Sequence, residues 1–130
     1  MVRRAQEAPA RVVASGTATE MRLLIGAEHG APNFAMRRFS MGAGGGMPLH
    51  TNSVEHEQYV LSGRAEIRIG DGSYRVEPGT VLFIPAGVPH SYQVMEAPFE
   101  FLCLVPNAED RVSILPDAPG GRPPKQARRS

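Results

Sequence analysis

The sequence has a single cysteine, almost no net charge and no long hydrophobic run. Cys103 is the only cysteine among 130 residues, which excludes an intrachain disulfide framework and agrees with a reducing compartment. The net charge of +1 gives no reason to expect a nucleic acid or an anionic surface as partner. No apolar run approaches the roughly 20 residues of a membrane helix, and the N-terminal residues lack the apolar stretch of a secretory signal. We therefore expect a cytoplasmic protein without a membrane or nucleic-acid partner.

Glycine and proline are abundant, and hydrophobic residues recur at the period of strands. The 14 glycines and 12 prolines favour short strands joined by turns over long helices. Apolar and polar residues alternate from Glu55 to Ile69, as in a half-buried antiparallel strand, and Asp71-Gly72 then forms a hairpin turn. Further strands are predicted at residues 21–25, 33–41, 73–77, 81–84 and 99–105, and the glycine-rich residues 42–46 are expected to interrupt the chain. The pattern predicts an all-β fold, a single antiparallel barrel or sandwich.

The two ends differ in composition from the middle of the chain. Residues 1–20 are polar and lack periodicity, so we expect a flexible arm that orders only on a partner subunit. Residues 21–108 form the expected barrel, and residues 109–130 form an extension whose proline-rich, basic end is expected to be disordered. The arm or an edge strand is expected to pair across a homodimer.

Three histidines stand at spacings that allow a shared metal site. Because strand side chains alternate between faces, His50, Asn52 and His56 can project to one side, and His90 can face them from another strand of a closed barrel. Three neutral imidazoles suit zinc, copper, iron, nickel or manganese and leave coordination positions open. The alternative is that each histidine is separately hydrogen-bonded in a polar barrel mouth, but the joint spacing favours a metal site. His29 matches no such spacing and is expected at the surface.

The first two histidines lie in a segment that resembles a motif of the cupin superfamily. That motif reads Gly, five residues, His-x-His, three or four residues, Glu, six residues, Gly. Gly44, His50, Asn52, His56 and Gly63 keep every interval, although asparagine replaces one histidine and histidine replaces the glutamate.

The third histidine lies in a segment that resembles the second cupin motif. Gly79, Pro85, Gly87 and His90 match the pattern Gly, five residues, Pro-x-Gly, two residues, His, and Val94 stands in place of the trailing asparagine. The chain thus shows a resemblance to small one-domain bacterial cupins that bind one metal through four histidines. This resemblance implies a double-stranded β-helix, or jelly-roll barrel, that holds one divalent transition metal per chain, namely Fe, Mn, Ni, Cu or Zn.

Carried over position by position, the resemblance makes His50, His56 and His90 ligands and puts Asn52 in place of the fourth. An amide oxygen is a weaker donor than imidazole to these metals. We therefore expect Asn52 to tune reactivity beside a further open position rather than to hold the metal.

The chemistry expected at this site is an oxygenase reaction on a small organic substrate. A redox metal with adjacent open positions can bind substrate and dioxygen side by side, within an apolar wall that excludes water. The side chains expected to form this wall and contact the substrate are Phe39, Tyr59, Phe83, Tyr92, Phe101 and Cys103.

Two other functions stay open. One is a non-catalytic module that binds or senses a small molecule, although no helix-turn-helix pattern accompanies the barrel. The other is an isomerase, epimerase or lyase acting on a small metabolite. It would need an acid/base pair, for which only His90 with Tyr92 or a glutamate is available.

Overall fold

The computed structural model describes residues 1–116 and the backbone of residues 125–126. This part of the chain is built almost entirely of strands, with two single turns of 3₁₀ helix at Ala5–Glu7 and Ala27–His29. The predicted all-β antiparallel barrel is confirmed. The strands are β1 (Ala10–Val12), β2 (Thr17–Ile25), β3 (Phe34–Asn52), β4 (His56–Ile69), β5 (Gly72–Val76), β6 (Val81–Ile84), β7 (His90–Pro106), β8 (Val112–Ile114) and β9 (Lys125–Gln126). No helix in the described residues is long and apolar enough to cross a membrane.

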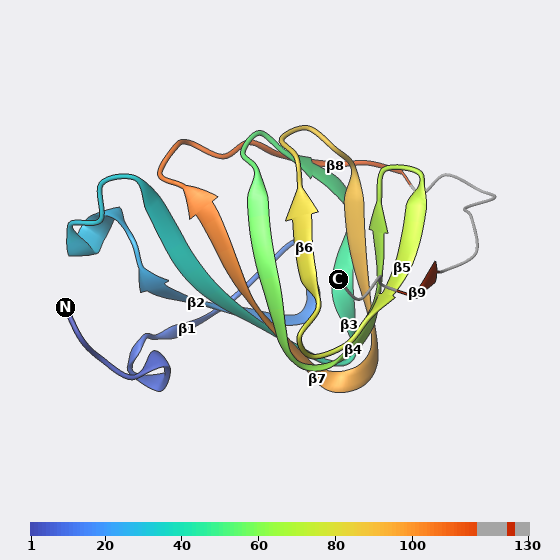
Figure 1. Cartoon of the computed structure of the whole chain (residues 1–130), viewed down its shortest axis with the longest axis horizontal. Coiled ribbons are helices and arrows are strands. Elements are labelled where there is room, and N and C mark those ends of the chain that lie inside the picture. Colours follow the sequence, from blue (N-terminus) through green and yellow to red (C-terminus); the bar gives the residue numbers. More distant parts are fainter. Residues whose placement is uncertain (117–124, 127–130) are drawn as a thin grey trace.

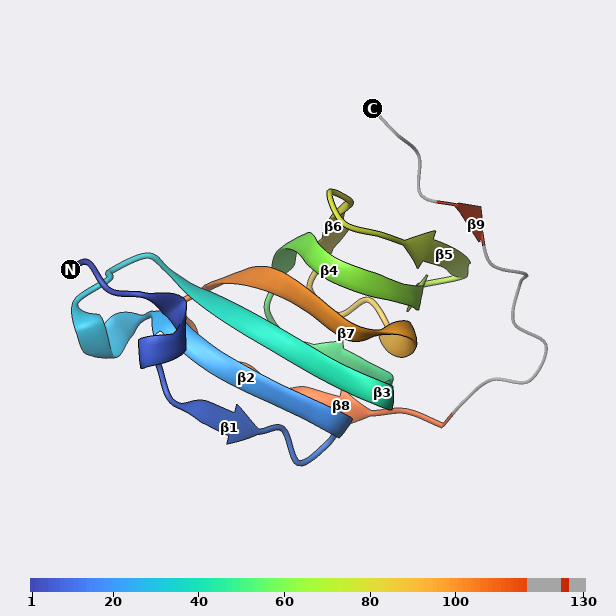
Figure 2. The same cartoon turned by 90° about the horizontal axis from the view of Figure 1, so that it is seen from below.

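The strands follow one another in the order β1-β2-β3-β7-β4-β5-β9, with β6 paired to β4 and β8 paired to β3. All pairings are antiparallel except that of β9 with β5. Figure 1 shows that the long strands bend along their length, and Figure 2 shows β1, β2, β3, β7, β4 and β5 in succession. Because β7 lies between β3 and β4, residues from three distant parts of the sequence line one concave inner face.

The hydrophobic core fills this inner face through the alternation of side chains along each strand. Phe99, Phe101 and Cys103 of β7 point inward and are buried, as is Met41 of β3. Complete burial of an apolar side chain of this size contributes about 1.5 to 3 kcal/mol. The core therefore fixes the register of β7 from Phe99 to Val105. In the first part of β7 the inward positions are even-numbered, so His90 and Tyr92 point inward.

A bulge in β4 reverses which residues face inward. Val60 is buried before the bulge and Ala65 after it, so the inward positions change from even to odd numbers. Gly63 has a φ of +75° there, and a Cβ at this position would lie 2.3 Å from the carbonyl oxygen of Pro98. Only glycine fits because the strands approach so closely.

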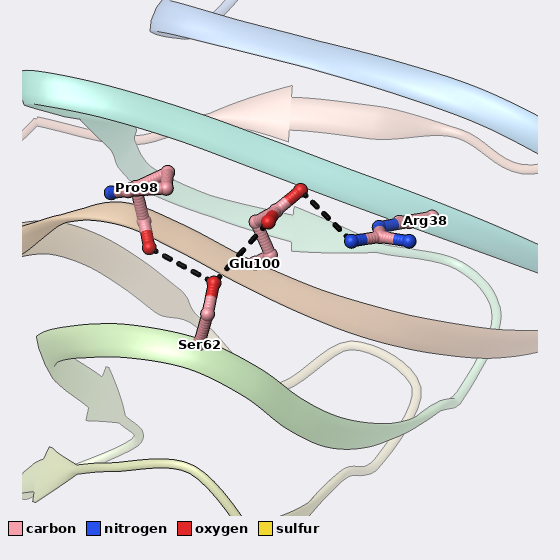
Figure 3. A network of polar contacts seen from close by, with 4 residues as sticks. All are labelled: Arg38, Ser62, Pro98 and Glu100. Carbon is pink, nitrogen blue, oxygen red and sulfur yellow. Dashed lines mark hydrogen bonds and ion pairs between the residues drawn. The ribbon is translucent and has the colours of Figure 1, made fainter. Parts of the chain in front are cut away.

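Polar contacts hold the bulge against its neighbours. The Ser62 hydroxyl lies 3.1 Å from the carbonyl oxygen of Pro98 and 3.2 Å from Oε1 of Glu100. Oε2 of Glu100 in turn lies 3.2 Å from Nη2 of Arg38 (Figure 3). The network joins β4, β7 and β3 on the outer face of the sheet.

The structure differs from the sequence prediction at three places. Residues 10–12 and 17–20 belong to the sheet rather than to a loose arm, because β1 pairs with β2 of the same chain. The glycine-rich residues 42–46 do not end the strand: β3 continues through them with a shift in register between Met41 and Gly46. Residues 112–114 form β8 on β3, whereas the predicted disorder at 117–124 and 127–130 lies outside the described residues.

Candidate functional site

The three predicted ligand histidines meet at the inner face of the barrel, and all are buried. His50 of β3 is paired in register with His90 of β7, and their ring centroids lie 4.1 Å apart. His56, at the start of β4, has its ring centroid 5.8 Å from that of His90. The pairing of β7 with both β3 and β4 thus brings together residues that are 40 positions apart in sequence. His29 lies away from this group, in the 3₁₀ turn that follows β2.

These histidines line a cavity of about 120 Å³ together with Asn52. An apolar cavity of roughly 150 Å³ is enough to hold a benzene molecule. The enclosed space therefore accepts about one ring or an equivalent planar group, and the rest of a larger ligand must extend through the mouth.

Three of the predicted wall residues form an aromatic side of the cavity. Phe39 stacks on Phe101 with centroids 5.1 Å apart, and Phe101 stacks on Tyr92 at 5.3 Å. The prediction was wrong for Tyr59 and Phe83, which are 47% and 58% exposed. Their neighbours along β4 and β6 point inward, so alternation directs both rings to the outer face.

Hydrogen bonds orient the imidazoles. Nδ1 of His50 lies 2.7 Å from the carbonyl oxygen of Pro48, and Nδ1 of His90 lies 3.0 Å from that of Val88. A carbonyl only accepts, so Nδ1 carries the proton in both rings and Nε2 keeps its lone pair. This is the arrangement of histidines that bind metals, in which the second ring nitrogen donates to a fixed acceptor.

His56 is oriented by Cys103 instead of a carbonyl. Its Nδ1 lies 3.5 Å from Sγ of Cys103, which is fully buried behind the ring. Nε2 of His56 and Nε2 of His90 are both buried without a hydrogen-bond partner among the described residues. Such an unsatisfied group costs about 1 to 3 kcal/mol, so these atoms are suited to a ligand that accepts their lone pairs.

Burial keeps His56 and His90 neutral at physiological pH. Desolvation, followed by the charge of Arg37, lowers the pKa of His56 to about 3, and desolvation lowers the pKa of His90 to about 4. Desolvation also raises the pKa of Tyr92, with a smaller contribution from Cys103. His56 and His90 therefore each keep a free lone pair. Tyr92 keeps its O–H, which donates to Oε1 of Gln58 at 3.0 Å.

Asn52 faces the cavity and is also tied to the C-terminal segment. Its Nδ2 donates to Oδ2 of Asp110 at 2.8 Å, while its Oδ1 is buried without a hydrogen-bond partner in residues 1–116. The backbone N–H of Ser53 donates to Oδ1 of the same carboxylate at 3.0 Å. Because β8 pairs with residues 50–52, the segment from Glu109 to Leu115 lies against the site and brings Asp110 to the cavity.

Sequence reasoning missed two charged residues of this cavity, Arg37 and Asp110. Arg37 has the same strand parity as Phe39, a signal that could have found it. Asp110 follows the motifs in a segment without periodicity, so no local signal points to it.

The cupin domain family matches residues 37–105, more than half of the chain, and this range contains all three histidines. The chain belongs to the cupin family. The cupin is similar over 92% of its length to the polyketide cyclase RemF from Streptomyces resistomycificus, with 30% identity, a TM-score of 0.78 and 90% of that chain covered. A cupin 2 domain-containing protein from Halorhodospira halophila is 30% identical over 78% of this chain and 72% of its own, with a TM-score of 0.70.

A third relative shares the fold alone. The predicted oxalate decarboxylase from Thermotoga maritima is 22% identical, with a TM-score of 0.71, and the match covers 83% of this cupin and all of that chain. No curated protein matches the sequence.

Cupin domains often bind a metal, and the residues of this cupin fit one in donor type. The Nδ1 atoms of His50 and His90 donate to carbonyl oxygens, so the lone pairs on their Nε2 atoms, together with the buried Nε2 of His56, are suited to a borderline divalent ion. Within residues 1–116, however, no three His, Cys, Asp or Glu side chains already stand in an arrangement that could hold a metal.

Proposed function

We propose that this cupin is a metal-dependent cyclase that closes a ring within a small substrate carrying several β-carbonyl groups. The observation that carries the proposal is the 30% identity to a polyketide cyclase over 92% of the chain, with 90% of that protein covered. The cavity supports it, since its aromatic side suits the planar, conjugated enol form of such a chain and its volume suits one ring at a time.

His50, His56 and His90 would hold the metal, with Oδ1 of Asn52 beside them. A bound divalent metal supplies Lewis-acid polarisation of a substrate carbonyl. Since these three imidazoles would be engaged as ligands, another group must accept the proton of the reaction.

Asp110 is the carboxylate placed to accept that proton. It lines the cavity, and donors from Asn52 and Ser53 fix its orientation while leaving further lone pairs on both oxygens. Asp110 takes the proton from a carbon between two carbonyls, and the C–H electron pair forms a bond to a second carbonyl carbon. The oxygen of that carbonyl then receives the proton from Asp110, so no oxidant or reductant is needed.

The aromatic side positions the chain and excludes water. Phe39, Phe101 and Tyr92 form a continuous stack against which a conjugated chain can lie flat. The hydroxyl of Tyr92 remains protonated because burial raises its pKa, and Gln58 fixes its direction. Holding the reacting carbons together in this way lowers the entropic cost of ring closure.

The test is ring closure of a synthetic tetraketide thioester, followed by chromatography coupled to mass spectrometry and by oxygen uptake. Because the proposed step is an isomerisation, the cyclic product has the mass of the substrate and a different retention time. The metal-loaded wild type should release a cyclic product without consuming oxygen. Asp110→Asn should lower kcat by about 10² or more with unchanged metal content, because general-base catalysis is worth 10²–10⁴. Glu109→Gln, which removes the same charge one position away, should leave kcat unchanged. An acyclic product, or equal rates for Asp110→Asn and wild type, would refute the proposal.

The oxygenase and the non-catalytic binding module predicted from the sequence stay predictions. The same assay distinguishes them. A dioxygenase consumes one O₂ in each turnover, whereas a binding module forms no product.

A further inference from the structure

Arg37 is a cation inside the cavity with no carboxylate partner. It lies on the inner face of β3 and lines the cavity beside Phe39. No ion pair within residues 1–116 includes it, and its Nε is buried without a hydrogen-bond partner. Its Nη2 donates to Sγ of Cys103 at 3.3 Å, and its guanidinium carbon lies 5.1 Å from the centre of the Phe39 ring.

The adjacent residue provides a contrast on the same strand. Arg38 points to the outer face, where its Nη2 lies 3.2 Å from Oε2 of Glu100 (Figure 3). The two neighbouring arginines thus differ in their partners. Arg38 on the outer face forms an ion pair with a carboxylate, and Arg37 on the inner face forms none within residues 1–116.

The carboxylate of the cavity is already engaged elsewhere. Asp110 accepts hydrogen bonds from Asn52 and Ser53 and does not reach Arg37 within the 4.0 Å of an ion pair. Arg37 is a partly buried guanidinium whose only hydrogen bond to the described part of the chain is to a sulfur, and most of its donors are unused there. An oxyanion is the partner that such a group takes, because its planar fork matches two oxygen atoms.

We propose that Arg37 is the docking residue for an oxyanion on a planar conjugated ligand, either a carboxylate or the enolate of a β-dicarbonyl. The cation stacks against Phe39, and the stack continues through Phe101 to Tyr92, so a flat ligand whose oxyanion meets Arg37 lies along an aromatic surface. This assignment deepens the proposed function. It rests on that function only where it identifies the oxyanion as part of the cyclase substrate.

The position of Arg37 gives it an effect on the rest of the site. Its charge contributes to the low pKa of His56 and opposes the rise in the pKa of Tyr92. An oxyanion on Arg37 would therefore lie within electrostatic range of the histidine cluster, where the proposed ring closure takes place.

The test compares benzoate with benzamide, which have the same shape but differ in charge, by calorimetric titration of the purified protein. Wild type should bind benzoate at least tenfold more tightly than benzamide, because a charge-assisted pair of this kind is worth about one factor of ten or more. Arg37→Gln should abolish the preference, and Arg38→Gln, the matched control, should retain it. Arg37→Lys keeps the charge and should retain part of the preference, which also serves if Arg37→Gln fails to fold.

Two further results separate this proposal from the binding of an anion to a metal. Wild type freed of metal with a chelator should keep the preference for benzoate. If the preference disappears in the metal-free protein or persists in Arg37→Gln, the anion binds elsewhere and the assignment is wrong. It is equally wrong if wild type does not discriminate between the two probes. If the preference depends on Arg37 but the tetraketide thioester is not cyclised, the proposed function falls and the docking residue stands.

Discussion

Asn52→Ala is expected to loosen the C-terminal segment over the cavity without unfolding the barrel. The substitution removes the 2.8 Å hydrogen bond from Nδ2 to the carboxylate of Asp110. A hydrogen bond to a charged group contributes about 1.5 to 3 kcal/mol, but Asp110 is exposed, so solvent screening reduces the expected loss to about 1 kcal/mol. The Ser53 N–H still holds the other carboxylate oxygen, and β8 remains paired with β3.

The assay is hydrogen exchange resolved by residue. The N–H of Arg111 bonds to Oγ of Ser53, and the N–H of Leu115 bonds to the carbonyl of Leu49, so both amides report opening of the segment. A loss of about 1 kcal/mol should raise their exchange rates about fivefold. The N–H of Gly79, bonded to Val60 on the far side of β4, should not change.

Thr51→Ala is the matched control, because its side chain points to the other face and forms no hydrogen bond with the described residues. It should leave exchange at Arg111 and Leu115 unchanged. Equal exchange in Asn52→Ala and wild type would show that the Asn52–Asp110 contact does not hold the segment. The positioning of Asp110 as a base would then lose its support.

Three other substitutions test separate parts of the account. Asn52→His should raise metal affinity and lower turnover, because imidazole is a better donor to borderline metals than an amide oxygen. A metal affinity and a turnover rate that both match those of wild type would contradict this prediction. Gly63→Ala should lower the free energy of unfolding by about 2 kcal/mol or more, since its Cβ would lie 2.3 Å from a carbonyl oxygen. Gly79→Ala, whose Cβ would have nothing within 4 Å, should lower it by only about 1 kcal/mol, the strain of a positive φ. Equal losses in denaturant titrations would exclude the close-approach explanation. Burial raises the pKa of Tyr92 in the folded state, so the unfolded chain releases this proton at a lower pH than the folded chain. The free energy of unfolding should therefore fall as the pH rises above about 10, by up to about 1.4 kcal/mol per pH unit. Tyr92→Phe should remove that part of the alkaline loss, and identical slopes in the two proteins would contradict the assignment.

The sequence predicted the barrel and the meeting of the histidines because both follow from local patterns. Strand alternation and the two motif intervals identify the inner face, and the structure brings His50, His56 and His90 to one cavity there. Their role as metal ligands stays a prediction. Applied consistently, the same alternation also places Tyr59 outward, three positions from His56, which the prediction of wall residues overlooked.

The remaining features depend on contacts between distant segments. Asp110 reaches the cavity only because the three-residue strand β8 pairs with residues 50–52. No sequence pattern in residues 109–116 predicts that pairing. The bulge at Gly63 similarly depends on how closely β7 approaches β4. The identity of Asn52 suggested a tuned metal site, whereas its hydrogen bond connects it to the C-terminal segment as well.

The central claim is that His50, His56 and His90 together hold one divalent metal. The most direct measurement is the metal content per chain, by elemental mass spectrometry, after loading and exhaustive dialysis of wild type and the three single alanine variants. Wild type and the control His29→Ala should retain about one metal per chain, and each of the other variants should retain almost none, because three neutral donors leave little redundancy. Metal-free wild type, or full occupancy in any of the three variants, would contradict the claim.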